Sequence, residues 1–138
     1  MARKVDRVII DTNLWISFLI TKDLKTLDSR VKTGKVKFIF SLELVEEFWS
    51  VANRPKFKKV FSRADIDQLL ELFDLYGELV QTKSKIQLCR DPKDDFLLAL
   101  AADSKADYLI TGDIDLLEIK KIGKTKIVTI ADYLKKVS

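Results

Sequence analysis

Histidine is absent from the 138-residue chain, and Cys89 is its single cysteine. The lack of histidine excludes Ser-His-Asp and Cys-His catalysis and zinc sites built on imidazole. One cysteine cannot form an intrachain disulfide. Any active site must therefore consist of carboxylates, lysines or hydroxyls.

Long apolar runs are also missing. Segments such as residues 8–20 are interrupted by Asp and Asn and are shorter than a bilayer span. We expect neither a transmembrane helix nor a signal peptide, and we place the chain in the cytoplasm. The few glycines and prolines separate regular elements and form no linker, so we expect a single domain over residues 1–138.

Short β-branched runs alternate with segments of helical periodicity. The pattern predicts strands at residues 7–11, 36–40, 78–82, 107–111 and 126–130, and helices at residues 12–20, 42–53, 66–77, 94–105 and 131–137. Ser41 is placed to cap the second helix, and the sequence SRAD at residues 62–65 fits a capping box. This alternation predicts an α/β fold with a mainly parallel sheet of about four or five strands.

Acidic residues lie where the expected strands end. Asp11 follows the first strand and Asp113 follows the strand at residues 107–111, so both are expected at the carboxyl edge of the sheet, where ligands of open α/β sheets bind. Asp94 and Asp95 open the helix before that strand. If this helix runs antiparallel to the strand, it begins near Asp113. Glu47 borders the apolar face of its helix, and Glu46 lies slightly farther round.

Each of these acids also has an ordinary interpretation. Asp94 and Asp95 are typical helix caps, Asp113 is typical of a turn, and Glu47 is typical of a solvated helix face. Together, however, several carboxylates within a few ångströms repel one another unless protons or cations compensate them. All-oxygen sites suit Mg²⁺ or Mn²⁺, which promote phosphodiester hydrolysis without histidine.

Two basic runs stand out in a chain with a net charge of +4. Arg54, Lys56, Lys58 and Lys59 form the first, and Lys120, Lys121, Lys124 and Lys126 form the second. Either run suits a phosphate backbone, and either is equally typical of a solvated surface.

The chain resembles a PIN-domain ribonuclease, and more narrowly the VapC-like toxin components of prokaryotic toxin–antitoxin systems. The segments that carry the resemblance are VIIDTN (8–13), SLELVEEFWSVANRPKF (41–57), CRDPKDDFLLALA (89–101) and ADYLITGDIDLL (106–117). The resemblance implies a three-layer α/β/α sandwich around a parallel sheet. It also implies an endoribonuclease that depends on Mg²⁺ or Mn²⁺.

Carried across by motif, the four family acids fall on Asp11, Glu47, Asp94 and Asp113. Asp11, Asp94 and Asp113, with Asp115 as an auxiliary acid, are the implied metal ligands, and Glu47 is implied to bind metal or to help activate water. The choices of Asp94 over Asp95 and of Asp113 over Asp115 stay open. Asn13, Thr111 and Asp95 are implied to orient the carboxylates. We expect both basic runs to hold the RNA backbone through their charge, with Arg54, Lys56, Lys58 and Lys59 as the main RNA-binding residues.

Partners follow from the resemblance alone: an RNA substrate, a small antitoxin protein and a second copy in a homodimer. The alternatives are an RNA-processing nuclease without an antitoxin and a PIN module that binds RNA or an antitoxin without cutting. A haloacid-dehalogenase-like phosphatase requires a second acid at position 13, where this chain has Asn. A phosphate-binding regulator without catalysis is a further alternative.

Overall fold

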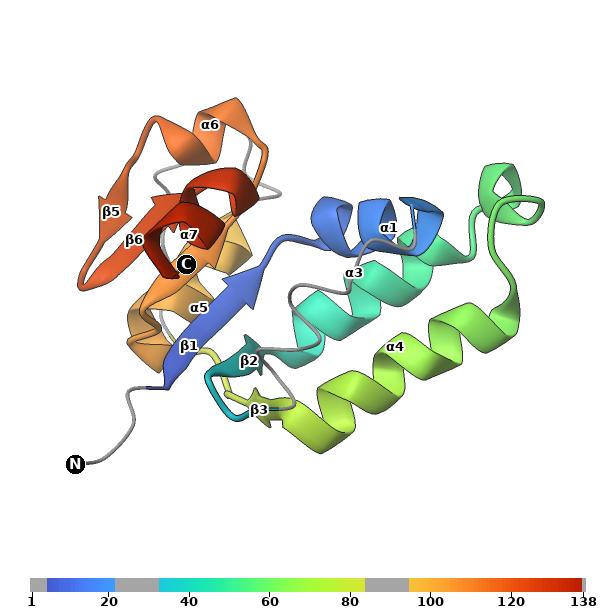
Figure 1. Ribbon diagram of the computed structural model, residues 1–138, viewed down its shortest axis with the longest axis horizontal. Helices are drawn as coiled ribbons and strands as arrows, with labels where there is room; N and C mark the ends of the chain where they lie inside the picture. The colour runs from blue at the N-terminus through green and yellow to red at the C-terminus, as the bar shows by residue number, and fades with distance from the viewer. Residues whose placement is uncertain (1–4, 22–32, 84–94, 138) are drawn as a thin grey trace.

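The computed structural model describes residues 5–21, 33–83 and 95–137 (Figure 1). Its strands are β1 (Asp6–Ile10), β2 (Val36–Phe40), β3 (Gly77–Leu79), β4 (Tyr108–Ile110), β5 (Lys121–Ile122) and β6 (Thr125–Val128). Its helices are α1 (Thr12–Thr21), α3 (Leu42–Ala52), α4 (Arg63–Tyr76), α5 (Asp95–Ser104), α6 (Ile114–Leu117) and α7 (Ile130–Val137), with a 3-10 turn, η1 (Pro55–Phe57).

The described strands form one sheet in the order β3-β2-β1-β4-β6-β5. All neighbouring strands are parallel except β5, which pairs with β6 in the antiparallel sense. In register, Val8 of β1 lies between Phe38 of β2 and Tyr108 of β4. β1, β2, β4 and β6 therefore end at the same edge, which we call the carboxyl edge, and begin at the opposite amino edge.

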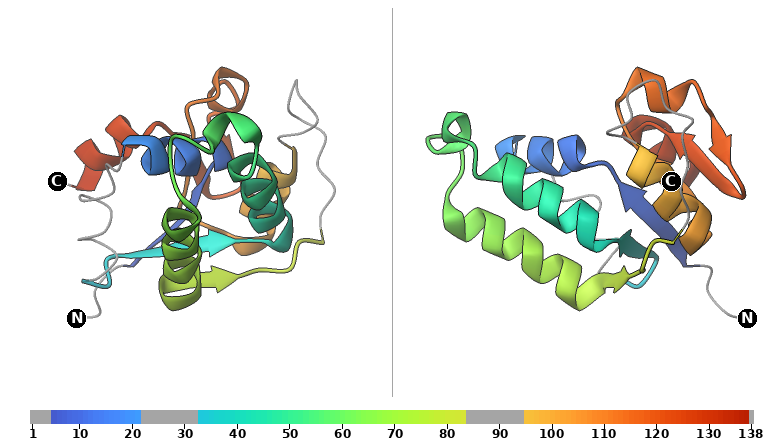
Figure 2. Two further views of the ribbon diagram at one scale, coloured as in Figure 1. Left: turned by 90° about the vertical axis from the view of Figure 1, so that its right-hand side faces the viewer. Right: turned by 180° about the vertical axis from the view of Figure 1, so that it is seen from behind.

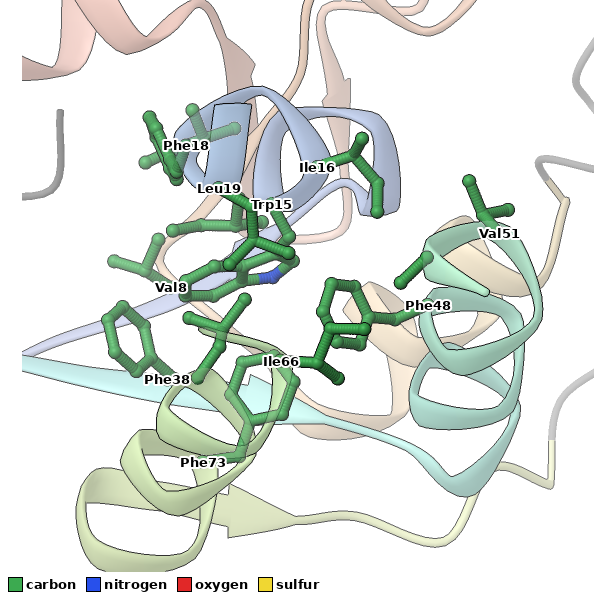
Figure 3. Close-up of a cluster of buried hydrophobic side chains, with 14 of the residues drawn as sticks. Val8, Trp15, Ile16, Phe18, Leu19, Phe38, Phe48, Val51, Ile66 and Phe73 are labelled. Carbon is green, nitrogen blue, oxygen red and sulfur yellow. The ribbon is translucent and has the colours of Figure 1, made fainter. Parts of the chain in front are cut away.

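Helices cover both faces of the sheet, and β1 is buried on both sides. Val8 and Ile10 pack with α1, α3 and α4 in one apolar cluster, whereas Ile9 packs with α5 in another. The centre of the first cluster is the indole of Trp15, which meets the rings of Phe38 and Phe73 edge to face at centroid distances of 5.0 and 4.8 Å (Figure 3). This packing holds α1 and α3 close to the carboxyl edge.

α3 and α4 form an antiparallel helical hairpin that extends away from the sheet, with η1 at its far end (Figures 1 and 2). The side chain of Ser41 accepts a hydrogen bond from Leu44 N at the start of α3. Ser62 and Asp65 form the expected capping box at the start of α4. These caps fix where the two helices begin relative to the turn between them.

The predicted α/β fold with a mainly parallel sheet is confirmed. The described sheet has six strands where four or five were expected, because β5 is a two-residue edge strand that is too short to show a pattern. α6 and η1 were also not predicted, since four and three residues are too few to show helical periodicity. Among the helices described, none is long and apolar enough to cross a membrane.

Gly77 joins α4 to β3, and we expect Gly77→Ala to destabilise the fold. A Cβ there would lie within 3.0 Å of the Phe73 carbonyl oxygen, which is a backbone atom of α4, and of the half-buried Phe40 ring. Overpacking of this kind costs about 1–3 kcal/mol, measured by urea unfolding. Gly112→Ala is the matched control, because an added Cβ at Gly112 meets no atom within 4 Å. Equal stability of the two variants would contradict this account of the junction.

Candidate active site

Asp11 stands at the carboxyl edge, between the last residue of β1 and the first residue of α1. Its backbone N donates to Ile110 O of β4 at 3.0 Å, which fixes it beside the neighbouring strand. Asp11 is 4% exposed as a residue, and its Oδ1 accepts a hydrogen bond from Asn13 N at 3.2 Å. Asp11 therefore caps α1, and this hydrogen bond holds its side chain in one orientation before any ligand binds.

Thr111 follows β4 and connects Asp11 to the next acid. Its fully buried hydroxyl donates to Asp11 Oδ2 at 2.7 Å and accepts from Asp113 N at 3.0 Å. One hydroxyl thus orients the Asp11 carboxylate and fixes the backbone at Asp113. The side chain of Asp113 in turn caps α6, since its Oδ1 accepts from Asp115 N at 2.9 Å.

Burial raises the pKa of Asp11 above its usual value, and repulsion from the Asp113 carboxylate raises it further. The hydrogen bonds from Thr111 and Asn13 oppose this rise by stabilising the charged form. Among the described residues, no lysine or arginine nitrogen lies within 4 Å of Asp11. The site therefore holds a buried negative charge beside a second one, and a hard divalent cation suits such an arrangement.

Glu47 reaches the same region from α3 and is half-buried, whereas Glu46 is exposed. The hydroxyl of Thr12, which is 2% exposed, donates to Glu47 Oε2 at 3.3 Å. The residue next to Asp11 in sequence thus contacts the glutamate of another helix. Thr12 was not predicted as a site residue from the sequence. The available signal was its hydroxyl, which directly follows Asp11 and is the first side chain of the largely apolar helix α1.

Asp95 and Asp115 are the remaining expected acids that the structure describes. Asp95 is the first residue of α5, and Asp115 lies in the first turn of α6; both are half-buried. Thr125, at the start of β6, donates to Ala101 O and Ala106 O, so α5 ends at the amino edge and Asp95 lies at its other end. Asp94 lies outside the described residues.

Asp11 and Asp113 are the acids that the structure brings together. Within the described ranges, no three His, Cys, Asp or Glu side chains are placed to hold a metal ion. Asp11 and Asp113 fit Mg²⁺ or Mn²⁺ as part of a ligand set, and further oxygen ligands would have to come from the remaining acids or from water.

A family model of the PIN domain matches residues 7–115. The chain belongs to the PIN-domain family. It is 30% identical over 122 residues to an uncharacterized protein of Methanocaldococcus jannaschii, MJ1680, and the match covers 86% of this chain and 77% of that protein. PIN domains are generally nucleases, and PIN nucleases generally use divalent metal ions.

Two solved structures share the fold. VapBC2 from Rickettsia felis, bound to a DNA fragment from its promoter, matches with a TM-score of 0.59 and 13% identity, over 88% of this chain and 96% of that chain. The PIN-domain endonuclease Utp24 matches with a TM-score of 0.56 and 21% identity, over 90% of this chain and 84% of that chain. At these identities the likeness shows the fold alone.

The two basic runs lie in different parts of this PIN domain. Arg54, Lys56, Lys58 and Lys59 are exposed on the connection between α3 and α4. The second run lies on the β5–β6 hairpin, where Lys126 pairs with Tyr108, the first residue of β4. Lys124 and Lys126 are therefore at the amino edge, away from Asp11.

We expect Asp11→Asn to stabilise the metal-free PIN domain at neutral pH by roughly 0.5–2 kcal/mol. Because the pKa of Asp11 is raised above 3.8 in the folded state, the folded protein binds this proton more tightly than the unfolded chain does. Ionisation of Asp11 therefore costs stability, and the cost grows as pH rises from 3.8 through the raised pKa.

Urea unfolding in EDTA over a pH series measures this effect, and the gain from Asp11→Asn should shrink as pH falls towards 3.8. Asp74→Asn, at an exposed position on α4, is the control for an equal change of charge. A metal-free Asp11→Asn variant that is less stable than wild type at neutral pH would show that burial of the charge is not costly.

Proposed function

We propose that this PIN domain is an endoribonuclease that depends on Mg²⁺ or Mn²⁺ and hydrolyses RNA phosphodiester bonds. The observation that carries the proposal is the buried Asp11 carboxylate, held by Thr111 beside Asp113. Burial of one carboxylate beside another costs stability, and a bound cation offsets that cost. A divalent cation between carboxylates is also what phosphoryl hydrolysis requires.

Asp11, Asp94 and Asp113 would hold the metal, with Asp115 as an auxiliary ligand. When bound, Mg²⁺ or Mn²⁺ supplies a nucleophilic hydroxide near neutral pH and neutralises charge on the phosphoryl group. Asn13, Thr111 and Asp95 orient these acids. Thr111 acts through its hydroxyl, whereas Asn13 acts at least through its backbone N–H.

Glu47 would hold metal or accept the proton of the attacking water. Attack occurs in line with the leaving oxygen and yields a 3′-hydroxyl and a 5′-phosphate without a covalent enzyme intermediate. The hydroxyl of Thr12 keeps the Glu47 carboxylate on the side of α3 that faces α1. Catalysis thus needs no histidine, because each proton transfer is made by water or a carboxylate.

In the cell we propose that the protein is the toxin of a toxin–antitoxin pair, acts on RNA in the cytoplasm, forms a homodimer and is covered by a small antitoxin. The sequence motifs and the fold shared with VapBC2 support this role. The fold shared with the PIN-domain endonuclease Utp24 supports nuclease activity, which the alternative of an RNA-processing nuclease without an antitoxin also has. Growth arrest on expression of the wild type but not of Asp11→Asn would separate the toxin from the processing enzyme.

Asp11→Asn should abolish RNA cleavage while the protein stays folded, because it removes a buried carboxylate from the site. The measurement is cleavage of labelled RNA with Mg²⁺, with Mn²⁺ and with EDTA, with circular dichroism as the test of folding. Asp74→Asn should cut at the wild-type rate. Metal-dependent cleavage that survives in Asp11→Asn would refute the site, and a folded wild type that cuts no RNA would favour the binding module.

Thr12→Val should lower kcat by roughly 10- to 100-fold, the usual effect of removing a hydrogen bond to a catalytic or metal-binding carboxylate. Valine keeps the size of threonine and loses the donor to Glu47. Thr12→Ser, which keeps the hydroxyl, should stay near the wild-type rate. Equal kcat values for the valine and serine variants would show that the Thr12–Glu47 hydrogen bond has no part in catalysis.

A further inference from the structure

We use the name tip for residues 54–63, which are most of the connection between α3 and α4 together with Arg63, the first residue of α4. α3 begins directly after the carboxyl end of β2, carries Glu47 and leads away from the sheet to the tip (Figures 1 and 2). From Glu47 to the end of α3 the helix rises about 8 Å, at about 1.5 Å per residue. The tip therefore lies at the carboxyl edge of the sheet, as the candidate active site does, but farther from the strands.

The tip has five cationic residues and no acidic one: Arg54, Lys56, Lys58, Lys59 and Arg63. Within the described parts of the chain, the first four have no carboxylate within 4 Å. Arg63 is paired with Asp67 at 3.4 Å, and both side chains are more than half exposed. The tip is therefore a patch of largely uncompensated positive charge.

The backbone of the tip is ordered by its own hydrogen bonds. Phe57 N donates to Arg54 O at 3.0 Å, Lys58 N to Pro55 O at 3.2 Å, and Val60 N to Phe57 O at 2.9 Å. The rings of Phe57 and Phe61 stack at a centroid distance of 5.4 Å. The cations are thus presented on a folded turn, so less conformational entropy is lost when they bind a ligand.

Two cations of the tip lie over aromatic rings. Lys56 Nζ is 5.0 Å from the centre of the Phe57 ring, and Arg63 Cζ is 4.5 Å from that of Trp49, whose side chain is partly exposed. A guanidinium plane backed by an indole is a surface on which an unpaired base can stack. Lysines for phosphates and a plane for bases fit RNA better than they fit an acidic protein segment.

RNA binding also needs attraction from outside the acidic site. Carboxylates at Asp11 and Asp113 repel the phosphates on either side of the scissile bond, and a bound cation compensates them only locally. The tip is the described basic patch that lies beyond the carboxyl edge. Lys124 and Lys126 lie at the amino edge, and Lys124 is within 3.6 Å of Asp107.

We propose that the tip is a second RNA contact, which holds the substrate strand several nucleotides away from the scissile phosphate. This inference rests on the proposed ribonuclease function and adds to it a requirement for substrate length. With about 3.4 Å of rise per nucleotide of a helical strand, the rise of about 8 Å from Glu47 to the end of α3 corresponds to more than two nucleotides. RNA too short to reach the tip loses this contact.

The first test is RNA binding by the full chain carrying Asp11→Asn, so that no RNA is cut. Changing Arg54, Lys56, Lys58 and Lys59 to Gln should weaken binding of a single-stranded RNA at least tenfold. It should also lower the slope of log Kd against log salt by about 3, since each neutralised phosphate contributes about 0.7. The matched control changes Lys120, Lys121, Lys124 and Lys126 to Gln, which removes the same charge, and should shift Kd less than twofold.

Equal weakening by the two quadruple variants would overturn the proposal, because net charge alone would then explain the binding. Unchanged RNA affinity in the tip variant would also overturn it. If that variant instead lost binding to polyglutamate, the tip would be a site for an acidic protein.

The second test is cleavage by chains with an intact Asp11. The tip variant should raise KM for RNA with arms of about ten nucleotides on both sides of the cut, with little change in kcat, and leave cleavage of RNA with arms of about two nucleotides unchanged. Equal losses on long and short RNA would overturn the length requirement. A wild type that binds RNA through the tip but never cuts it would remove the proposed function and leave the RNA contact standing.

Discussion

The hydrogen bond from Thr111 to Asp11 is the interaction on which the candidate site depends. It joins residues that are 100 positions apart, and it exists because β1 and β4 are neighbours in the sheet. Parallel pairing makes both strands end at the same edge, so a carboxylate after one strand meets a hydroxyl after the other. The same hydroxyl fixes the backbone at Asp113. Strand order, more than any local motif, therefore places the two acids together.

The helix-capping and active-site interpretations of these aspartates do not exclude each other. Asp11 accepts from Asn13 N at the start of α1, and Asp113 accepts from Asp115 N at the start of α6. Each cap uses one carboxylate oxygen and leaves lone pairs for a cation. Capping thus holds the acids in place before metal binds, and less reorganisation is needed on binding. The cost is the raised pKa of Asp11, which records the burial of its charge beside Asp113.

Much of the fold could be predicted from the sequence because the signals are local. β-branched runs, helical periodicity and the caps at Ser41 and Ser62 depend on neighbours within a few residues. The position of Asp11 at the sheet edge followed from the strand before it. The contact of Thr12 with Glu47 could not be predicted, since it depends on how α1 packs against α3. Composition also could not show which basic run lies nearer to Asp11, because only strand pairing places Lys124 and Lys126 at the amino edge.

Without histidine, the response of the site to pH is set by carboxylates. A raised pKa means that Asp11 takes up a proton at a higher pH than an ordinary aspartate does. Protonation relieves the buried charge and stabilises the fold, but it also removes the charge that attracts a cation. Acid should therefore act on folding and on metal binding in opposite directions. The Thr111 hydroxyl limits this conflict, because its hydrogen bond lowers the pKa of Asp11 and extends the range of pH over which the carboxylate stays charged.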